Sequence, residues 1–282
     1  MKRRDFLYAT LSAAALLCSP SLLAAPSNFD DIRASGRLRV AVYRDFPPFS
    51  FEKNGVLQGI DVDLAKRIGQ KIGLEIEFMQ LTATEDVDGD LRNAIWKGHY
   101  LGGGTADLML HVPNDQDFAT RNHNAVLFAP YWQEQLSWAA PNGAPRSSWD
   151  IHAEERIGVE NDSLADLYLS ALQGGRLRDH IQHFPNTLSA VQALKNEQVD
   201  GVFAPQAELS WALHALGLDI QPQVIKTPGL IKARWNLGMA TKESLRDLTW
   251  VIGDIVEQLR QAGELSTIFE RYHSRYLPAV TE

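Results

Sequence analysis

The sequence predicts an α/β protein with two lobes, mostly parallel sheets and a hinge of two crossings between the lobes. Short apolar runs alternate with amphipathic stretches along the chain, and the alternation occurs as two successive sets. A late apolar run, NLGMA (236–240), is predicted to be a strand that returns to the first set. Two crossings form a hinge, and a hinge beside a cleft suits closure on a ligand.

The first set begins with RLRVAVY (37–43), which predicts a buried strand. The segment GIDVDLAKRIGQKIG then places its apolar residues on one helical face, with Asp61 as the expected N-cap. The next predicted elements are a strand at 74–79, a helix over GDLRNAIWKG, a strand at 106–112, and AVLFAPYW leading to a strand at 135–140.

The second set begins with a strand at 156–160, and Asp162 or Ser163 can cap the helix LADLYLSALQ. A helix over TLSAVQALKNEQ and a strand VDGVFA follow, and the chain ends in helices through LSTIFERYHSRYL. We expect one lobe from 26–134 plus 241–282 and the other from 135–240, with hinges near 134–137 and 237–241.

The first 25 residues have the features of an export signal: a basic head, an apolar middle and small residues before a cut. Arg3-Arg4-Asp5-Phe6-Leu7 resembles the twin-arginine type, although a general secretory signal can also start this way. Cys18 follows Leu17, which is not small, so a lipid anchor is not expected. We predict a periplasmic protein.

Composition excludes several classes of function. Removal of residues 1–25 takes away three positive charges and one negative, which moves the formal charge from -8 to -10. A protein of this charge is not expected to bind nucleic acid or an anionic membrane through its overall field. Its only cysteine leaves with the signal, so disulfides and thiolate metal sites are excluded.

The segment GHYLGGGTADLMLHVPNDQDFATR (98–121) carries three consecutive glycines. A phosphate-binding loop has its glycines after a strand and before a helix, whereas here they follow a helix and precede a strand. We therefore interpret the glycines as a conformationally permissive loop. An alternative is that His99 and Tyr100 form a docking surface at the outer end of the lobe.

The other end of that strand is predicted to face the ligand, because ligands bind beyond the carboxyl ends of strands. We expect His111, Val112 and Pro113 to line the cleft. Four residues could suggest a metal, but their spacing fits no known ligand pattern, and no metal or cofactor is expected. These are His111, Asp115, Asp117 and His123.

The stretch LRVAVYRDFPPFSFEKNGVLQGIDVDLAKRIGQKIGLEIEF resembles the start of family 3 periplasmic solute-binding proteins of the polar amino acid type. VLFAPYW, IGVENDSLADLYL, LSAVQALKNEQVDGVFA and QAGELSTIFERYHSRYL match in the family's order. The resemblance implies a two-lobed periplasmic-binding-protein fold without catalysis. It implies that the protein delivers a small polar or carboxylate-bearing solute to the membrane subunits of an ABC importer.

The resemblance also implies a set of ligand contacts. Tyr43, Phe46 and Phe49 would form an aromatic wall, although at least one of them is expected to pack in the core. Arg121 would hold a ligand carboxylate through its planar fork. It stands later than the family's usual arginine, and a surface salt bridge is the alternative.

In the second lobe, Asp162 and Ser163 stand at a helix N-terminus, and the strand VDGVFA ends at Pro205 and Gln206. Amino-acid binders of this family usually carry an aspartate at the position of Pro205, which holds the ligand ammonium. Proline cannot replace that charge, so we expect carboxylates without an amine, or neutral polar solutes, to bind better than α-amino acids.

Two other functions remain as alternatives. The residues Arg92, Asn93, Val112, Pro113, Asp117, Thr120 and Arg121 resemble a pattern found in binding-protein-like partners of quinoprotein alcohol dehydrogenases, which would make a periplasmic quinoprotein dehydrogenase the partner. Cyclohexadienyl dehydratases also resemble the family and carry a catalytic glutamate near the place of Glu208. An acid in an apolar cleft could donate a proton to a leaving hydroxyl.

Overall fold

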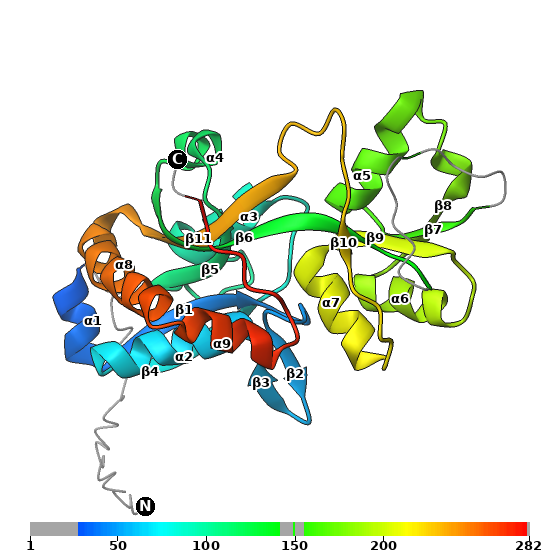
Figure 1. The fold of residues 1–282 in the computed structure, drawn as a ribbon. Coiled ribbons are helices and arrows are strands. Elements are labelled where there is room, and N and C mark those ends of the chain that lie inside the picture. The colour runs from blue at the N-terminus through cyan, green and yellow to red at the C-terminus, as the bar shows by residue number, and fades with distance from the viewer. Residues whose placement is uncertain (1–27, 142–148, 150–154, 281–282) are drawn as a thin grey trace, which may run out of the picture.

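The computed structural model describes residues 28–141, 149 and 155–280 of the chain, which form a two-lobed α/β structure (Figure 1). The predicted signal segment 1–25 lies outside these residues. The elements of the first part are α1 (Phe29–Ser35), β1 (Arg37–Tyr43), β2 (Phe51–Lys53), β3 (Val56–Gln58), α2 (Ile60–Ile72), β4 (Glu75–Leu81), α3 (Val87–Leu91), a π-helical turn (Arg92–Trp96), β5 (Leu108–Pro113), α4 (Gln116–Arg121) and β6 (Ala125–Ala139). Those of the second part are β7 (Ile157–Glu160), α5 (Leu164–Ala171), β8 (Ile181–Phe184), α6 (Thr187–Lys195), β9 (Gly201–Pro205), α7 (Gln206–Ala215), β10 (Gln223–Val224), β11 (Arg234–Lys242), α8 (Arg246–Gln261) and α9 (Glu264–Arg271).

The main sheet has the strand order β4-β1-β5-β11-β6-β9-β7-β8, and β10 pairs with β6. The predicted parallel pairing is confirmed at both flanks, where β1 lies between β4 and β5 and β7 lies between β8 and β9. The strands that join the flanks, β11 and β6, pair antiparallel with each other and with their outer neighbours. The fold is therefore a mixed sheet with a parallel set in each lobe.

The strand β6 runs from one lobe into the other (Figure 1). The sequence predicted a strand at 135–140 preceded by AVLFAPYW, and the structure joins both into one continuous strand. An irregularity does occur near Pro130, which has no N–H for the ladder: Ala129 has a φ of 45° and the pairing with β11 shifts register between Leu237 and Met239. The predicted hinges near 134–137 and 237–241 fall in β6 and β11, and the lobe boundaries remain predictions.

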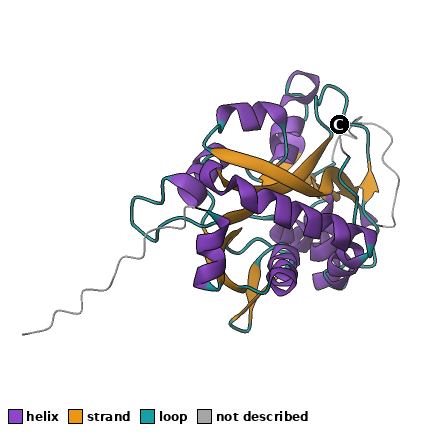
Figure 2. Cartoon of the chain, turned by 90° about the vertical axis from the view of Figure 1, so that its left-hand side faces the viewer, coloured by secondary structure: helices purple, strands orange, loops and turns teal. Residues whose placement is uncertain are grey.

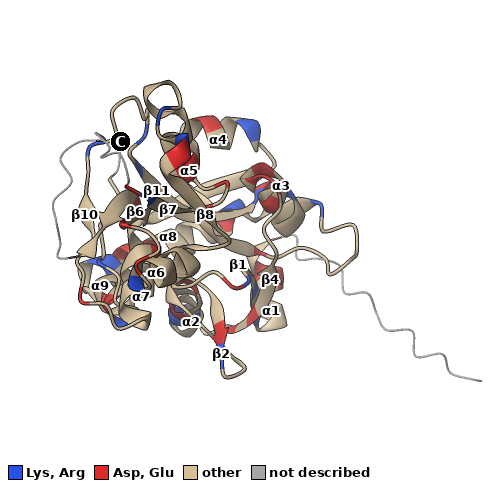
Figure 3. Ribbon diagram, turned by 90° about the vertical axis from the view of Figure 1, so that its right-hand side faces the viewer, with Lys and Arg blue, Asp and Glu red and all other residues tan. Residues whose placement is uncertain are grey.

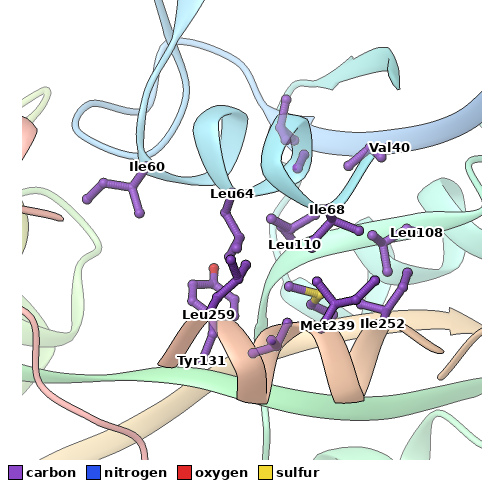
Figure 4. Packing of buried hydrophobic residues seen from close by; sticks show 14 of the residues in the cluster. Val40, Ile60, Leu64, Ile68, Leu108, Leu110, Tyr131, Met239, Ile252 and Leu259 are labelled. Atoms are coloured by element: carbon purple, nitrogen blue, oxygen red, sulfur yellow. The ribbon is translucent and has the colours of Figure 1, made fainter. Parts of the chain in front are cut away.

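Helix α2 packs its apolar face onto the first lobe's sheet, where Ile60, Leu64 and Ile68 are fully buried (Figure 4). The predicted N-cap of this helix is wrong. Gly59 is the N-cap, without a side-chain bond, and the helix starts at Ile60. Asp61 is 1% exposed and accepts a hydrogen bond of 2.8 Å from the Tyr131 hydroxyl, so this carboxylate faces the protein interior.

Helices pack on both sides of the strands (Figure 2). In the first lobe, one core cluster contains buried residues of α2, α8 and α9, and another contains those of α3 and the π-helical turn. In the second lobe, α5 contributes to one core cluster and α6 and α7 to another. Within the described ranges, no helix is both long enough and apolar enough to cross a bilayer.

Candidate ligand-binding cleft

A cavity of about 300 Å³, the cleft cavity, lies between the two lobes. Its first-lobe wall comes from β2 and the segment before it, and its second-lobe wall comes from the end of β7 and the first turns of α6 and α7. The second-lobe groups thus lie at or just beyond strand carboxyl ends, where open α/β sheets bind ligands. The lining residues are Asp45, Phe46, Pro47, Phe51, Glu52, Glu160, Asn186, Thr187, Leu188, Glu208 and Trp211.

The charged groups of the cleft cavity are all acidic. Asp45 and Glu52 line it from the first lobe, and Glu160 and Glu208 from the second, while no lysine or arginine is among its lining residues in the described part of the chain. Acidic residues are red and basic residues blue in Figure 3, where both colours occur at β2. The cavity therefore presents a negative potential to a ligand.

Glu160 and Glu208 are joined through Thr187. The Glu160 Oε2 atom accepts hydrogen bonds from the Thr187 N–H and lies 3.0 Å from its hydroxyl. The same hydroxyl lies 3.2 Å from Glu208 Oε2. A hydroxyl has one hydrogen and cannot donate to both carboxylates. The geometry is satisfied when Glu208 carries a proton and donates it to Thr187 Oγ1, while Thr187 donates to Glu160.

The electrostatics agree with that proton assignment. Burial, with the negative charges of Glu160 and Glu134 added, raises the pKa of Glu208 well above its usual range. Burial also raises the pKa of Glu160, although the two hydrogen bonds from Thr187 oppose that shift. The hydrogen-bond geometry and the raised pKa therefore both favour a protonated Glu208 in the ligand-free protein.

Glu134 forms a second layer behind the cavity. This β6 residue is 2% exposed, and its carboxylate accepts from the N–H groups of Gln135, Gln206 and Ala207 at 2.8, 3.1 and 3.4 Å. Burial raises the pKa of Glu134 to about 8, against the opposing effect of these N–H groups. The carboxyl group therefore occupies the N-terminus of α7.

Aromatic side chains complete the cavity. Phe51 and Trp211 meet edge to face with their ring centroids 5.4 Å apart, one from each lobe. Phe46 lines the cavity and packs against the rings of Phe49, His111 and Tyr43 at centroid distances of 5.1, 4.9 and 5.8 Å. Aromatic faces beside carboxylates suit an organic cation.

The structure thus brings together four of the predicted first-lobe residues, and one of them lines the cavity. Tyr43 donates its hydroxyl to Asp90, and Phe49 is 1% exposed in the core. The His111 ring packs 4.1 Å from Phe49, and its Nδ1 atom lies 3.3 Å from the buried Asp61 Oδ2. These three side chains form the layer that supports Phe46.

Val112 and Pro113, the other two predicted residues of this strand end, are held by the sheet. Val112 is 1% exposed in the core below α3, and it pairs with Gly238 of β11. Pro113 pairs with Leu237. Neither lines the cleft cavity.

Arg121 lies outside the cleft cavity. It ends α4, its side chain is 58% exposed, and its Nε and Nη2 atoms lie 3.4 Å from the carboxylate of Asp88. The segment predicted to be a cleft-lining loop forms a short helix here, because Asp115 caps it by accepting from the Phe118 N–H at 2.9 Å. Arg121 therefore forms the surface salt bridge that was the alternative to a ligand contact.

The predicted second-lobe residues lie next to the cavity without lining it. Ser163 is the N-cap of α5, as expected, and Asp162 precedes it with a φ of 59°. Pro205 ends β9 and precedes α7, and the buried Gln206 accepts a hydrogen bond from the Gln135 side chain. Gln206 and its neighbour Ala207 reach the site only through their backbone bonds to Glu134.

Several residues that line the cleft cavity were not predicted to do so. Thr187 begins a helix that was predicted, but Asn186 and Thr187 follow β8, a four-residue strand that was not, so the place of this helix start beside the cleft was missed. Phe51 and Glu52 belong to the short β2–β3 hairpin, and Trp211 lies on α7. A glutamate inside the apolar strand of β6 was the available signal for Glu134, since a buried carboxylate needs partners.

The three glycines of the segment 98–121 do not line the cleft cavity. Gly102, Gly103 and Gly104 have φ values of 96°, 95° and 70°, which confirms a loop that needs glycine. The loop lines a separate cavity of about 270 Å³ beside β4. Nowhere in the described ranges do three or more His, Cys, Asp or Glu side chains gather as a metal site would require.

Comparison with known proteins agrees with the resemblance seen in the sequence. Residues 38–94 match bacterial extracellular solute-binding proteins, family 3. A probable histidine-binding protein of Neisseria gonorrhoeae is 24% identical over 276 residues, which are 93% of this chain and 95% of that protein. A cyclohexadienyl dehydratase of Pseudomonas aeruginosa is 43% identical over 67 residues, which are 23% of this chain and 25% of the enzyme.

Solved structures show the same fold. An ancestral cationic amino acid solute-binding protein superposes with a TM-score of 0.69 at 20% identity, covering 87% of this chain and 99% of that one. An amino acid ABC transporter substrate-binding protein from Streptococcus pneumoniae, bound to L-arginine, gives a TM-score of 0.61 at 21% identity, covering 86% and 97%.

Proposed function

We propose that this chain, a family 3 solute-binding protein, captures a small organic cation in the cleft cavity. The observation that carries the proposal is the lining: four carboxyl groups, three large aromatic side chains and no basic residue among the described residues. The names of the relatives support it, since they include histidine-binding and cationic amino acid-binding proteins. Among the described lining residues, none is a cation that could bind the carboxylate of the solute expected from Arg121.

Delivery to the membrane subunits of an ABC importer, from the periplasm, is the role that the family implies. The mixed sheet supports a closing motion, because β6 and β11 are the strands that connect the parallel sets of the two lobes. A periplasmic quinoprotein dehydrogenase remains the alternative partner.

Removing the charge of Glu208 should weaken binding of the cation. Glutamine at this position can still donate to Thr187, as the protonated acid does, but it cannot become negative when the ligand arrives. We expect Glu208→Gln to lower affinity about 10- to 100-fold, since a charge-assisted hydrogen bond contributes about 1.5–3 kcal/mol. Calorimetric titration of arginine, lysine and histidine into both proteins measures this.

The matched control is Asp219→Asn, which removes an exposed carboxylate outside the cleft cavity and should leave affinity unchanged. Because ligand binding would ionise Glu208, the wild type should release protons on binding, and its affinity should rise as the pH rises toward the pKa of Glu208. Equal affinities of wild type and Glu208→Gln would contradict the proposal.

Ligand should also bring the lobes together. X-ray scattering with a saturating cation should show a smaller radius of gyration than the ligand-free protein, because closure buries the cleft walls. At a concentration that saturates the wild type but not Glu208→Gln, the variant should scatter as it does without ligand, which controls for solvent effects. Bound ligand without compaction would argue against closure about β6 and β11.

A second candidate function is a dehydration reaction. It is favoured by Glu208, a cavity-lining acid whose pKa is raised by burial, and by the short match to a cyclohexadienyl dehydratase. Formation of an aromatic product from a cyclohexadienyl alcohol would distinguish this activity from binding alone.

A further inference from the structure

We infer that the preferred ligand is an organic cation without a carboxylate: an amine, guanidine or imidazole compound rather than an amino acid. This inference rests on the proposed function and names the ligand class of the same cavity. It depends on what the cavity offers to the second half of an amino acid, its carboxylate. Among the described lining residues the structure gives that group no cation, and carboxyl groups of the chain already hold the first N–H groups of two neighbouring helices.

No cation is available for a ligand carboxylate among the lining residues that the structure describes. Arg44 and Lys53 are next to lining residues in sequence, but both are exposed and neither lines the cavity. Arg121, the arginine expected to hold a carboxylate, pairs with Asp88 outside it. A carboxylate placed here would lie among like charges without a partner, which is costly.

Backbone N–H groups at helix N-termini are the other usual partners of a ligand carboxylate. In this protein its own glutamates occupy them. Glu160 accepts the N–H of Thr187 at the start of α6, at 3.0 Å. Glu134 accepts those of Gln206 and Ala207 at the start of α7, at 3.1 and 3.4 Å.

This arrangement has an electrostatic consequence. A helix N-terminus normally provides partial positive charge, and here carboxyl oxygens of the chain already accept its first N–H groups. To bind those N–H groups, an incoming carboxylate would have to displace Glu160 or Glu134. An incoming cation needs no displacement, since Glu160 and Glu208 keep free oxygen lone pairs toward the cavity that they line.

Pairs of compounds that differ only in the carboxylate test this inference. The probes are agmatine and arginine, histamine and histidine, and cadaverine and lysine, each titrated calorimetrically into the wild-type protein. We expect the carboxylate-free member to bind about tenfold or more tightly in at least one pair, because an unpaired buried charge costs more than 1.4 kcal/mol.

The Glu160→Ala variant sharpens the test, because it frees the Thr187 N–H and removes one repulsive charge. Both members of a pair lose the same contact to Glu160, so the ratio of their affinities isolates the carboxylate. We expect this ratio to move toward the amino acid by about tenfold, while Asp219→Asn leaves it unchanged.

The outcomes separate this inference from the proposed function. If arginine, histidine or lysine binds as tightly as its partner or tighter, the inference is overturned and the cation-binding function stands. If no probe binds a folded wild-type protein, as judged by its cooperative thermal unfolding, both are overturned. An unchanged ratio in Glu160→Ala would show that the occupied N–H group does not determine selectivity.

Discussion

Gly59→Ala is expected to destabilise the protein by more than about 3 kcal/mol, through overlap of backbone atoms together with an unfavourable φ. Gly59 has a φ of 136°, and a Cβ built on it would overlap the carbonyl of Phe49 and lie 2.8 Å from the Ser50 nitrogen. These are backbone atoms held by hydrogen bonds: Asp61 N–H donates to the Phe49 oxygen at 3.0 Å and Gly59 N–H to the Tyr272 hydroxyl at 2.9 Å. No flexible side chain can move to make room.

The added Cβ would displace the turn at Phe49 and Ser50, which lies between the cavity-lining Phe46 and Phe51. The molecules of the variant that still fold should therefore also bind ligand weakly. Urea denaturation measures the free energy of unfolding. Gly73→Ala is the control, since Gly73 has a φ of 71° with no atom within 4 Å of a built Cβ, so only the backbone cost of about 1–2 kcal/mol applies. Equal losses in the two variants would show that the predicted overlap is relieved in solution.

The regular elements were predictable because their signals are local. The apolar run 37–43 is β1 within the predicted bounds, and the periodic apolar residues after Gly59 form α2. Strand β8 was missed because its four residues, IQHF, carry too short a pattern to be distinguished from a loop. The antiparallel pairing of β6 and β11 was missed because it joins residues far apart in the chain.

The site was predictable only in part. The family resemblance named Phe46, which lines the cavity, whereas the rule that ligands bind beyond strand carboxyl ends selected His111, Val112 and Pro113, which do not line it. The Glu160–Thr187–Glu208 arrangement joins residues 27 and 21 positions apart, so no spacing in the sequence indicates it. Arg121 was expected in the cleft, but the structure places it outside the cavity. Its pairing with Asp88, 33 positions earlier, depends on where α4 and α3 pack.

Glu134→Gln is expected to change how stability depends on pH. The folded-state pKa of Glu134 is about 8, above its ordinary 4.5, because burial penalises the charged form. Between these values the folded protein holds a proton that the unfolded chain has released. The free energy of unfolding therefore falls as the pH rises from about 4.5 to 8, by up to roughly 1.4 kcal/mol per pH unit from this group.

Glutamine has no proton to lose, so Glu134→Gln should flatten that slope and gain stability relative to wild type at pH 8. Glu208 contributes with the same sign, since its pKa is also raised, and the double variant with Glu208→Gln should be flatter still. Urea denaturation at several pH values measures the slopes, and Glu270→Gln, at an exposed position, should keep the wild-type slope. If Glu134→Gln also keeps it, then the pKa of Glu134 is not raised in solution, because the N–H groups of Gln135, Gln206 and Ala207 hold its carboxylate in the charged form.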